Sequence, residues 1–390
     1  MPGAEACSFS PLLQYQTTTT ILDGASSENG GVAQRPSAKV YAGGVKPLAS
    51  EDLEHILRHT LPLWESARGR RIFISGGTGF FGAWLLESLV FCNRELNLNT
   101  TATVLSRDPG TFARRMSHIA CEESIQLLQG DVRDFALPDQ EFEYVIHAAS
   151  PTSAAEASNP AELLSTLHDG TERMLLLAKS RGTAKFLFTS SGAVYGRQPN
   201  DLSHIPEDYL GSPNWLDPNA AYAEGKRVSE QMCSILAAES DIHFTIARCF
   251  AFVGPHLPLN QHFAIGNFIG GAIAGRNIAI RGDGAPMRSY LYAADLAVWL
   301  WTMLFRKPEP PSNPSVFNVG SGEAISIADL ARTVVEALDP SLQIEIARQP
   351  SKGAQAEQYV PDVRKAKASL GLHPMIGLQE AINRTAAWYR

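Results

Sequence analysis

The sequence predicts an α/β protein in which helices cover both faces of a doubly wound parallel sheet, with a smaller C-terminal lobe. Three observations lead to this prediction. Short apolar runs rich in strand-forming residues alternate with segments of helical periodicity between about residues 70 and 250. A glycine-rich turn joins the first apolar run to the helix that follows it. Beyond residue 250 the alternation becomes irregular, and glycine and proline are more frequent. Parallel strands need long crossover connections, so the alternation favours a parallel sheet.

The first segment that we expect to be ordered is a helix beginning near Ser50. Residues 1–45 are rich in Ser, Thr, Gly and Ala without sustained periodicity, which predicts a mobile extension. In "SEDLEHILRHTLPLWESARG" the apolar residues recur at helical spacing, with acids in the first turn and Gly69 near the end. We expect this helix to lead into the main domain.

The alternation gives the order of the remaining elements. The expected strands occupy 71–75, 101–106, 124–130, 143–149, 184–191 and 243–250, and helices are expected over 82–92 and 161–182. Residues 46–250 are therefore expected to form mainly the sheet domain. Residues 251–390 are expected to form mainly the second lobe, interleaved with late elements of the sheet.

The composition narrows the choice of partners and compartment. The net charge of −7 argues against a polyanion such as nucleic acid. The five cysteines are scattered without a CxxC pair, which favours a reduced, cytoplasmic protein and no metal site. The first residues show neither a basic stretch nor an apolar core, and no run of about 18 apolar residues occurs. We therefore expect no signal peptide and no membrane span.

The glycine-rich turn has the spacing of a dinucleotide-binding loop. In "FISGGTGFFGAWLLE", Gly76, Gly79 and Gly82 stand between the first strand and the helix after it. Such glycines allow a tight turn, let the backbone approach a diphosphate and permit close packing of helix on strand. The pattern predicts a Rossmann-type domain that binds NAD or NADP. The loop residues expected at the cofactor are Gly76, Thr78, Gly79, Phe80 and Phe81.

The ends of the next strands are expected to hold the adenosine part of the cofactor. An NAD site usually places an acid at the end of the second strand, whereas this chain has Ser106 and Arg107 there. Arg107 slightly favours NADP, because an arginine can pair with its 2′-phosphate. NAD is kept as the alternative cofactor. After the third strand, Asp131 is expected to accept from the adenine amino group and Val132 to pack on its ring. Small residues after the fourth strand, Ala148 and Ala149, let the cofactor lie against the backbone.

A tyrosine and a lysine four residues apart suggest a proton-transfer pair. In "NAAYAEGKRVSEQ", the spacing of Tyr222 and Lys226 places both side chains on one helical face. A free tyrosine has a pKa near 10, and a neighbouring lysine and a positive nicotinamide ring lower it toward the working range of a base. The competing interpretation is an ordinary surface helix, because this spacing also arises by chance.

Several motifs, in order, extend this interpretation to a family. The chain resembles the extended short-chain dehydrogenase/reductases, the group of NAD(P)-dependent nucleotide-sugar epimerases and dehydratases, from about residue 46 to its end. The segments that carry the resemblance are GGTGFFG, GDVRD, HAAS, FTSSGAVYG, YAEGK, GDGAPMRSYLYAADLA and NVGSGEAISIADLA. The resemblance implies a tightly bound, recycled cofactor, a nucleotide-diphosphate sugar as substrate and a homodimer that pairs through two helices of each subunit.

The resemblance also implies roles for individual residues. Tyr222 would take a proton from a sugar hydroxyl while the carbon gives a hydride to the nicotinamide. Lys226 would bond the cofactor ribose, and Ser191 would help to hold the reacting oxygen. Residues expected to contact the substrate are Ser150, Ser191, Tyr195, Asn267 and Arg288. For Arg288, the alternative is a structural ion pair with Asp283 or Asp295, and His256 is a further candidate for the sugar pocket.

Two positions bear on the type of reaction. Sugar dehydratases of this group carry an Asp-Glu pair, and uronate decarboxylases a Glu at the second place, where this chain has Gly192 and Ala193. Neither residue transfers a proton, which suits a 4-epimerase acting by transient oxidation at C4. However, "EGKR" at 224–227 looks more like the decarboxylase branch. The alternatives are therefore a decarboxylase, a dehydratase, a keto-sugar reductase and, in a different class, a non-catalytic NAD(P)-binding sensor.

Overall fold

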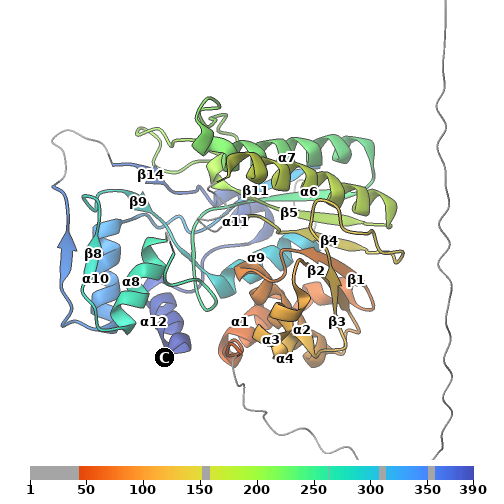
Figure 1. Ribbon diagram of the computed structural model, residues 1–390, viewed down its shortest axis with the longest axis horizontal. Helices are drawn as coiled ribbons and strands as arrows, with labels where there is room; N and C mark the ends of the chain where they lie inside the picture. Colours follow the sequence, from red (N-terminus) through yellow and green to blue (C-terminus); the bar gives the residue numbers. More distant parts are fainter. Residues whose placement is uncertain (1–43, 152–158, 262, 307–312, 350–355) are drawn as a thin grey trace, which may run out of the picture. The chain divides into compact units, whose positions relative to one another are not determined.

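A parallel sheet organises the part of the chain that the computed structural model describes, namely residues 44–151, 159–261, 263–306, 313–349 and 356–390 (Figure 1). Within these residues the sheet has seven strands in the order β11-β6-β5-β4-β1-β2-β3. The strands are β1 (Arg71–Ser75), β2 (Thr101–Ser106), β3 (Ile125–Gln129), β4 (Tyr144–His147), β5 (Lys185–Ser191), β6 (His243–Cys249) and β11 (Ser315–Val319). The predicted doubly wound sheet is confirmed. The winding reverses between β1 and β4, and ligands of such sheets bind beyond the carboxyl ends of the strands at this point.

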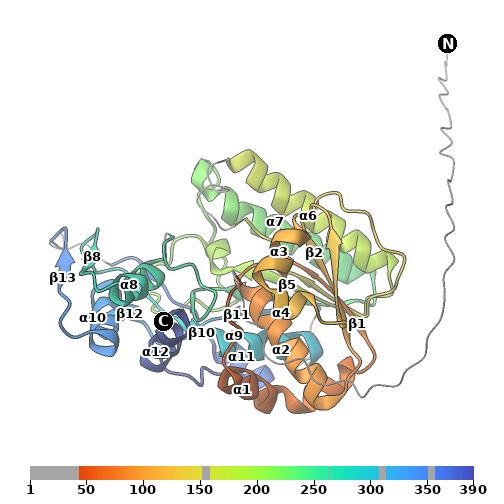
Figure 2. The same cartoon turned by 60° about the horizontal axis from the view of Figure 1, so that its bottom comes forward.

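Helices cover both faces of the sheet (Figures 1 and 2). On one face lie α1 (Ser50–Thr60), α2 (Phe80–Leu96), α3 (Pro109–Arg115), α4 (Ser117–Ala120) and α9 (Ala293–Phe305); on the other lie α6 (Pro160–Ser180) and α7 (Ala221–Glu239). Successive side chains of a strand point to opposite faces. In β1, Ile72 and Ile74 accordingly join the core on the α2 side, whereas Phe73 joins the core beneath α6 and α7.

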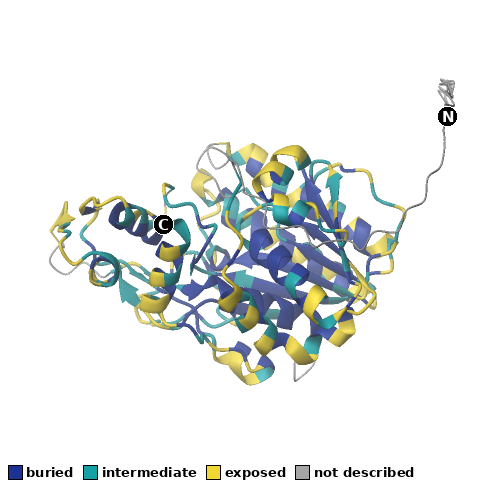
Figure 3. Cartoon of the chain, turned by 90° about the horizontal axis from the view of Figure 1, so that it is seen from below, coloured by how far each residue is buried: buried dark blue, intermediate teal, exposed yellow. Residues whose placement is uncertain are grey.

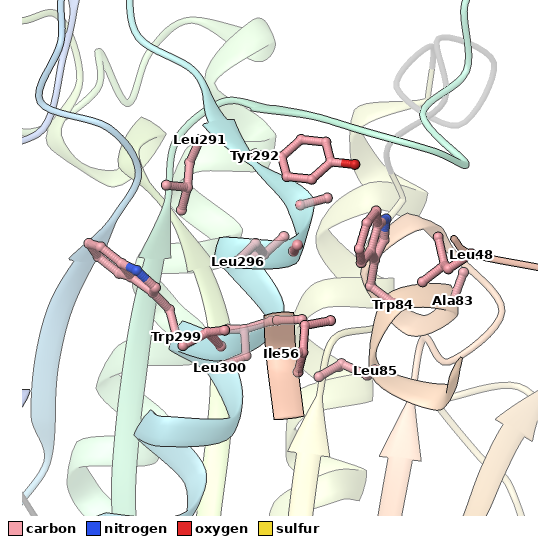
Figure 4. Close-up of a cluster of buried hydrophobic side chains, with 14 of the residues drawn as sticks. Leu48, Ile56, Ala83, Trp84, Leu85, Leu291, Tyr292, Leu296, Trp299 and Leu300 are labelled. Atoms are coloured by element: carbon pink, nitrogen blue, oxygen red, sulfur yellow. The ribbon is translucent and has the colours of Figure 1, made fainter. Parts of the chain in front are cut away.

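Helix α9 forms the centre of the larger core, and each of its residues is buried (Figure 3). A helix that is apolar on all sides must be enclosed by other elements. Figure 4 shows how its Leu296 and Trp299 lie with Trp84 of α2 and Ile56 of α1. Although α9 and β11 come late in the chain, they belong to the layers of the main sheet.

Helix α1, which precedes the sheet, contacts helix α12 (Leu378–Tyr389) near the C-terminal end of the described chain. The expected helix from Ser50 ends at Thr60, because Pro62 lies in the first turn of the following 3-10 helix η1 (Leu61–Ala67). The buried Asp52 accepts from the Tyr292 hydroxyl at 2.7 Å and from Arg384 Nη1 at 2.7 Å. Arg384 belongs to α12. Helix α1 is therefore fastened to the C-terminal end.

The later part of the chain adds a lobe of short elements. Its helices are α8 (Ala264–Ile273), α10 (Ile327–Leu338), α11 (Arg364–Leu370) and α12, with α8, α10 and α12 in mutual contact. Its strands are β7 (Phe252–Val253), β8 (Ile278–Ile280), β9 (Met287–Arg288), β10 (Leu291–Tyr292), β12 (Ile325–Ser326), β13 (Ile344–Ile346) and β14 (Gln358–Tyr359). Three of them form the small sheet β12-β9-β14. The boundary predicted at residue 250 stays a prediction, and most of the predicted extension 1–45 lies outside the described residues.

The described ranges contain neither a candidate membrane span nor a candidate metal cluster. None of the helices there is both long and apolar enough to cross a membrane. The same ranges contain no cluster of His, Cys, Asp and Glu side chains that could hold a metal ion.

Candidate active site

Two glycines of the loop after β1 are required by the packing of the protein itself. Gly76 has a φ of 74°, and a Cβ built on it would lie 2.5 Å from the backbone nitrogen of Ala149. A Cβ on Gly82 would overlap the backbone of Gly77, so this glycine lets α2 pack closely against the turn. Larger residues at 76 and 82 would therefore separate the loop from its neighbours.

The third glycine has a different reason to be small. A Cβ on Gly79 would meet only the Gly76 carbonyl oxygen at 3.5 Å, which is ordinary contact. Gly79 is exposed and caps α2 without any side-chain hydrogen bond within the described residues. The N–H groups of a first helical turn bind anions, and a glycine there lets a diphosphate approach the backbone. The loop therefore fits a dinucleotide. Beside it, the Thr78 carbonyl accepts from Arg115, and the rings of Phe80 and Phe81 pack against the core.

The strand ends at the adenosine side carry charges that are already engaged. The Asp108 carboxylate caps α3 by accepting from the Thr111 amide at 2.9 Å and from the Thr111 hydroxyl at 2.6 Å. Asp131 accepts from Arg133 Nε at 2.8 Å, and this bond holds the pKa of Asp131 below its usual value, with the exposed Arg107 acting in the same direction. Val132 is buried against Gly170 of α6. The role of Arg107 toward a 2′-phosphate stays a prediction.

Helix α7 presents Tyr222 and Lys226 to the end of β5, as their spacing predicts. Lys226 is 1% exposed, and its Nζ donates to the Thr189 carbonyl at 2.8 Å. Burial lowers the pKa of Lys226 to about 8. Burial also raises the pKa of Tyr222, and the hydroxyls of Ser191 and Ser150 act in the opposite direction. The phenol of Tyr222 therefore needs nearby positive charge before it can act as a base.

The three hydroxyl residues at the end of β5 have different partners. The Thr189 hydroxyl donates to the His147 carbonyl at 3.3 Å, and the Ser190 hydroxyl donates to Glu230 Oε1 at 2.5 Å. Ser191 Oγ accepts from the Ala193 amide at 3.1 Å and faces Tyr222. Of the three, Ser191 alone faces the proton-transfer pair.

A further hydroxyl beside the pair is left for another molecule. Ser150 Oγ is shielded from solvent and makes no hydrogen bond of good geometry within the described part of the chain. It nevertheless lies close enough to the Tyr222 phenol to lower the pKa of that phenol. Buried polar atoms normally have partners, so an unpaired hydroxyl at this point fits contact with a bound molecule.

Comparison with known proteins agrees with this geometry. The model of the NAD dependent epimerase/dehydratase family matches residues 72–320. The chain belongs to this family. Members are NAD-dependent, and the glycine loop fits that cofactor, so the protein is an NAD-dependent enzyme of the epimerase/dehydratase type.

Relatives and solved structures extend the comparison. UDP-glucuronic acid decarboxylase 1 of Xenopus tropicalis is 31% identical over 82% of this chain and 72% of its own length. The Arabidopsis thaliana protein of the same name is 30% identical over 85% of this chain and 72% of its own. UDP-glucose 4-epimerase of Thermotoga maritima, solved with UDP-glucose, has a TM-score of 0.68 and 23% identity, covering 82% of this chain and 98% of that one. MoeE5, solved with UDP-glucuronic acid and NAD, has a TM-score of 0.67 and 22% identity, covering 82% and 99%.

Arg288 of this epimerase/dehydratase protein has an ion-pair partner that the sequence did not indicate. Its Nη2 lies 2.7 Å from Glu357 Oε1. The suggested alternatives are wrong: Asp295 accepts from His55 Nε2 and from the Met375 and Ile376 amides, and Asp283 accepts from the Ala285 amide. The Glu357 partner is itself largely exposed, so the guanidinium of Arg288 stays accessible to a competing anion.

Two other predicted contacts, Tyr195 and His256, have partners within the protein. Tyr195 is 1% exposed, and its hydroxyl donates to Asn318 Oδ1 at 2.8 Å. His256 lies 3.1 Å from Glu87 and packs against Trp388. Both residues have the contacts of packed side chains. Asn267 is exposed on α8, and its role toward the substrate stays a prediction.

The decarboxylase-like "EGKR" stretch also has a structural use. Arg227 donates to the Val194 carbonyl at 3.0 Å and to the Gly211 carbonyl at 3.1 Å, and it lies 3.6 Å from Glu224. These bonds fasten the loop that precedes α7. This part of the resemblance therefore reflects how the loop is held, and it gives no independent support for a particular reaction.

Sequence reasoning missed one aromatic residue of the site. The Tyr359 hydroxyl of β14 lies beside residue 192, close enough to Ser191 and Tyr222 for both to act on the pKa of Tyr359. It lies in a two-residue strand, for which no periodicity exists. The one signal that pointed to it was Gly192, because a glycine at this place leaves room for a neighbouring side chain.

Proposed function

We propose that the protein is a UDP-sugar 4-epimerase that oxidises the sugar at C4, lets the keto sugar turn over and reduces it from the other face. The observation that supports this most is the meeting of Ser191, Tyr222 and Lys226 beside positions 192 and 193, which lack any proton-transferring side chain. Epimerisation needs one reversible hydride transfer and one reversible proton transfer, and no further acid. The relatives and neighbours with UDP-sugars in their names support the choice of nucleotide.

The residues of the site match this chemistry. NAD supplies the hydride acceptor and a positive ring when it is bound. Tyr222 takes the proton of the C4 hydroxyl and returns it after the sugar has turned over. Lys226 lies one helical turn from Tyr222, and the positive nicotinamide ring would offset the burial that raises the pKa of Tyr222. Ser191 donates to the C4 oxygen, because its own oxygen already accepts from Ala193.

A second candidate is decarboxylation of UDP-glucuronate, and the names of the most similar relatives favour it. Oxidation at C4 of a uronate gives a β-keto acid, which loses carbon dioxide when the resulting enolate is stabilised. Ala193 offers no carboxyl group for that step, and the Arg227 contacts are structural. For these two reasons we rank decarboxylation second.

The deciding experiment is incubation of the NAD-loaded protein with the UDP derivatives of glucose, galactose, glucuronate and galacturonate. We expect a product of unchanged mass whose ring proton couplings, measured by NMR, show inversion at C4. A product lacking carbon dioxide would replace the epimerase by the decarboxylase. The matched variant is Tyr222→Phe, which removes only the hydroxyl and is expected to lower turnover by about 10²–10⁴-fold. Equal turnover by this variant would contradict the assigned base.

The predicted homodimer remains a proposal. Helices α6 and α7 expose four large apolar side chains: Leu164, Leu176, Val228 and Ile235. The two helices pack against each other on one face of the sheet, so a second copy would cover these side chains.

A further inference from the structure

The small sheet β12-β9-β14 brings two side chains of the later lobe to the active site. β9 and β14 are parallel, and Arg288 and Tyr359 are register partners. The Arg288 guanidinium lies 6.0 Å from the centre of the Tyr359 ring. The Tyr359 ring also packs against Phe250, with the ring centres 4.6 Å apart. The orientation of the Tyr359 phenol is therefore fixed by aromatic packing and by strand pairing.

This phenol lies where a side chain on residue 192 would be. A Cβ built on Gly192 would lie 2.7 Å from the Tyr359 hydroxyl and 2.7 Å from Phe250 Cζ. Both distances are too short for real contacts, so residue 192 and Tyr359 cannot both carry full side chains here. Tyr359 can therefore approach Ser191 only because residue 192 is glycine. The same glycine leaves position 192 without an acidic side chain.

The groups around Tyr359 keep it protonated. Those that face it are the Ser191 hydroxyl, the Tyr222 phenol, the Cys249 thiol and the Arg288 guanidinium. Burial raises the pKa of Tyr359 most; Ser191 and Arg288 lower it, and Tyr222 and Cys249 raise it. When Tyr222 ionises, Tyr359 therefore remains neutral. A phenol that stays neutral beside the base is suited to the role of hydrogen-bond donor.

The hydrogen bonds of Ser191 leave one place for such a donor. Its oxygen accepts from the Ala193 amide at 3.1 Å, and a hydroxyl oxygen has a second lone pair and one hydrogen to donate. If the second lone pair accepts from Tyr359, the Ser191 hydrogen must point away from both donors. The Tyr222 phenol is close enough to the Ser191 hydroxyl for that hydroxyl to lower the pKa of the phenol.

We propose that Tyr359 is a positioning residue: it donates to Ser191 Oγ and so directs the Ser191 hydrogen to the sugar oxygen that Tyr222 deprotonates. This inference rests on the proposed function. It assigns a tyrosine of the later lobe to a place in the catalytic centre. Gly192 has no side chain to fill that place.

The test is Tyr359→Phe in the NAD-loaded protein, measured with the UDP-sugar that the wild type converts. The ring and its packing on Phe250 remain, and only the hydroxyl is lost. We expect kcat to fall about tenfold, the loss of one hydrogen bond, with the KM for sugar within about twofold. Before the sugar binds, a less well directed Ser191 would lower the pKa of Tyr222 less, so the acid limb of the kcat/KM profile should move to higher pH.

A double-mutant cycle separates this role from simple packing. Because Tyr359 acts through Ser191, S191A/Y359F should be no more than about twofold slower than S191A alone. The control is Tyr209→Phe, a neighbouring tyrosine outside the catalytic residues, which should retain wild-type kcat and pH profile. The inference would be overturned by fully additive losses, by an unmoved acid limb or by wild-type kcat in Y359F. It would also be overturned if weaker NAD binding or a lower Tm accounted for the loss. If the wild type converts no UDP-sugar, the proposed function itself fails. If the wild type is active and Y359F is equally active, only the role of Tyr359 fails.

Discussion

The cofactor side and the substrate side of the site are built in different ways. On the cofactor side, the loop after β1 meets the backbone after β4, and glycines such as Gly76 set the geometry. On the substrate side, short strands and loops from distant parts of the chain supply single side chains, including Arg288 and Tyr359. The first side is fixed by backbone packing, so it tolerates little change. The second depends on separate side chains, so we expect single substitutions there to leave the fold intact.

The largest expected effect follows from this difference and concerns two glycines of one loop. Gly76→Ala forces a Cβ into the backbone after β4 at a positive φ, so we expect the free energy of unfolding to fall by about 3 kcal/mol or more. The control is Gly79→Ala, whose Cβ meets only ordinary contact. It should keep wild-type stability in a denaturant titration while losing NAD affinity in a fluorescence titration. Equal stability of the two variants would contradict a cofactor side fixed by packing.

A second test concerns the pH dependence of stability through Lys226. Burial lowers the pKa of this lysine to about 8, below the value of about 10.4 for a free lysine, so the unfolded chain binds more protons between these two values. The free energy of unfolding of the cofactor-free protein should therefore gain a rising contribution as pH increases from about 8 to 10. Lys226→Met removes this contribution, and denaturant titrations at several pH values should show a flatter profile for the variant. A parallel pair of profiles would mean that Lys226 is charged in the folded protein across this range.

The smallest of these effects is expected on the substrate side. Arg288→Met should raise the KM for the UDP-sugar by about ten- to a hundredfold, as for the loss of a charge-assisted hydrogen bond, while NAD affinity and Tm stay as in the wild type. Glu357→Gln serves as the control, because it removes only the exposed ion-pair partner of Arg288. Its KM should remain near that of the wild type. A fall in Tm for Arg288→Met would show instead that this side also supports the fold.

The two sides also differ in how far the sequence predicts them. The strands 71–75 and 101–106 agree with the structure at both ends, since each apolar run is bounded by polar residues or glycine. Tyr222 and Lys226 could be paired because their spacing is local to one helix. The contact of Tyr359 with Ser191, and the Arg288–Glu357 pair, arise from short strands that meet only through tertiary packing. Periodicity carries no information about such contacts. The predicted helix from Ser50 was too long for a local reason, because Pro62 cannot continue it.

The fastening of α1 to α12 has a consequence for how the chain is completed during synthesis. Asp52 leaves the ribosome 332 residues before Arg384, with which it pairs in the folded protein. Until the last helix emerges, the Asp52 carboxylate lacks its cationic partner, and an unpaired charge resists burial. We therefore expect helix α1 to dock stably against α9 and Tyr292 only once α12 is available to supply Arg384.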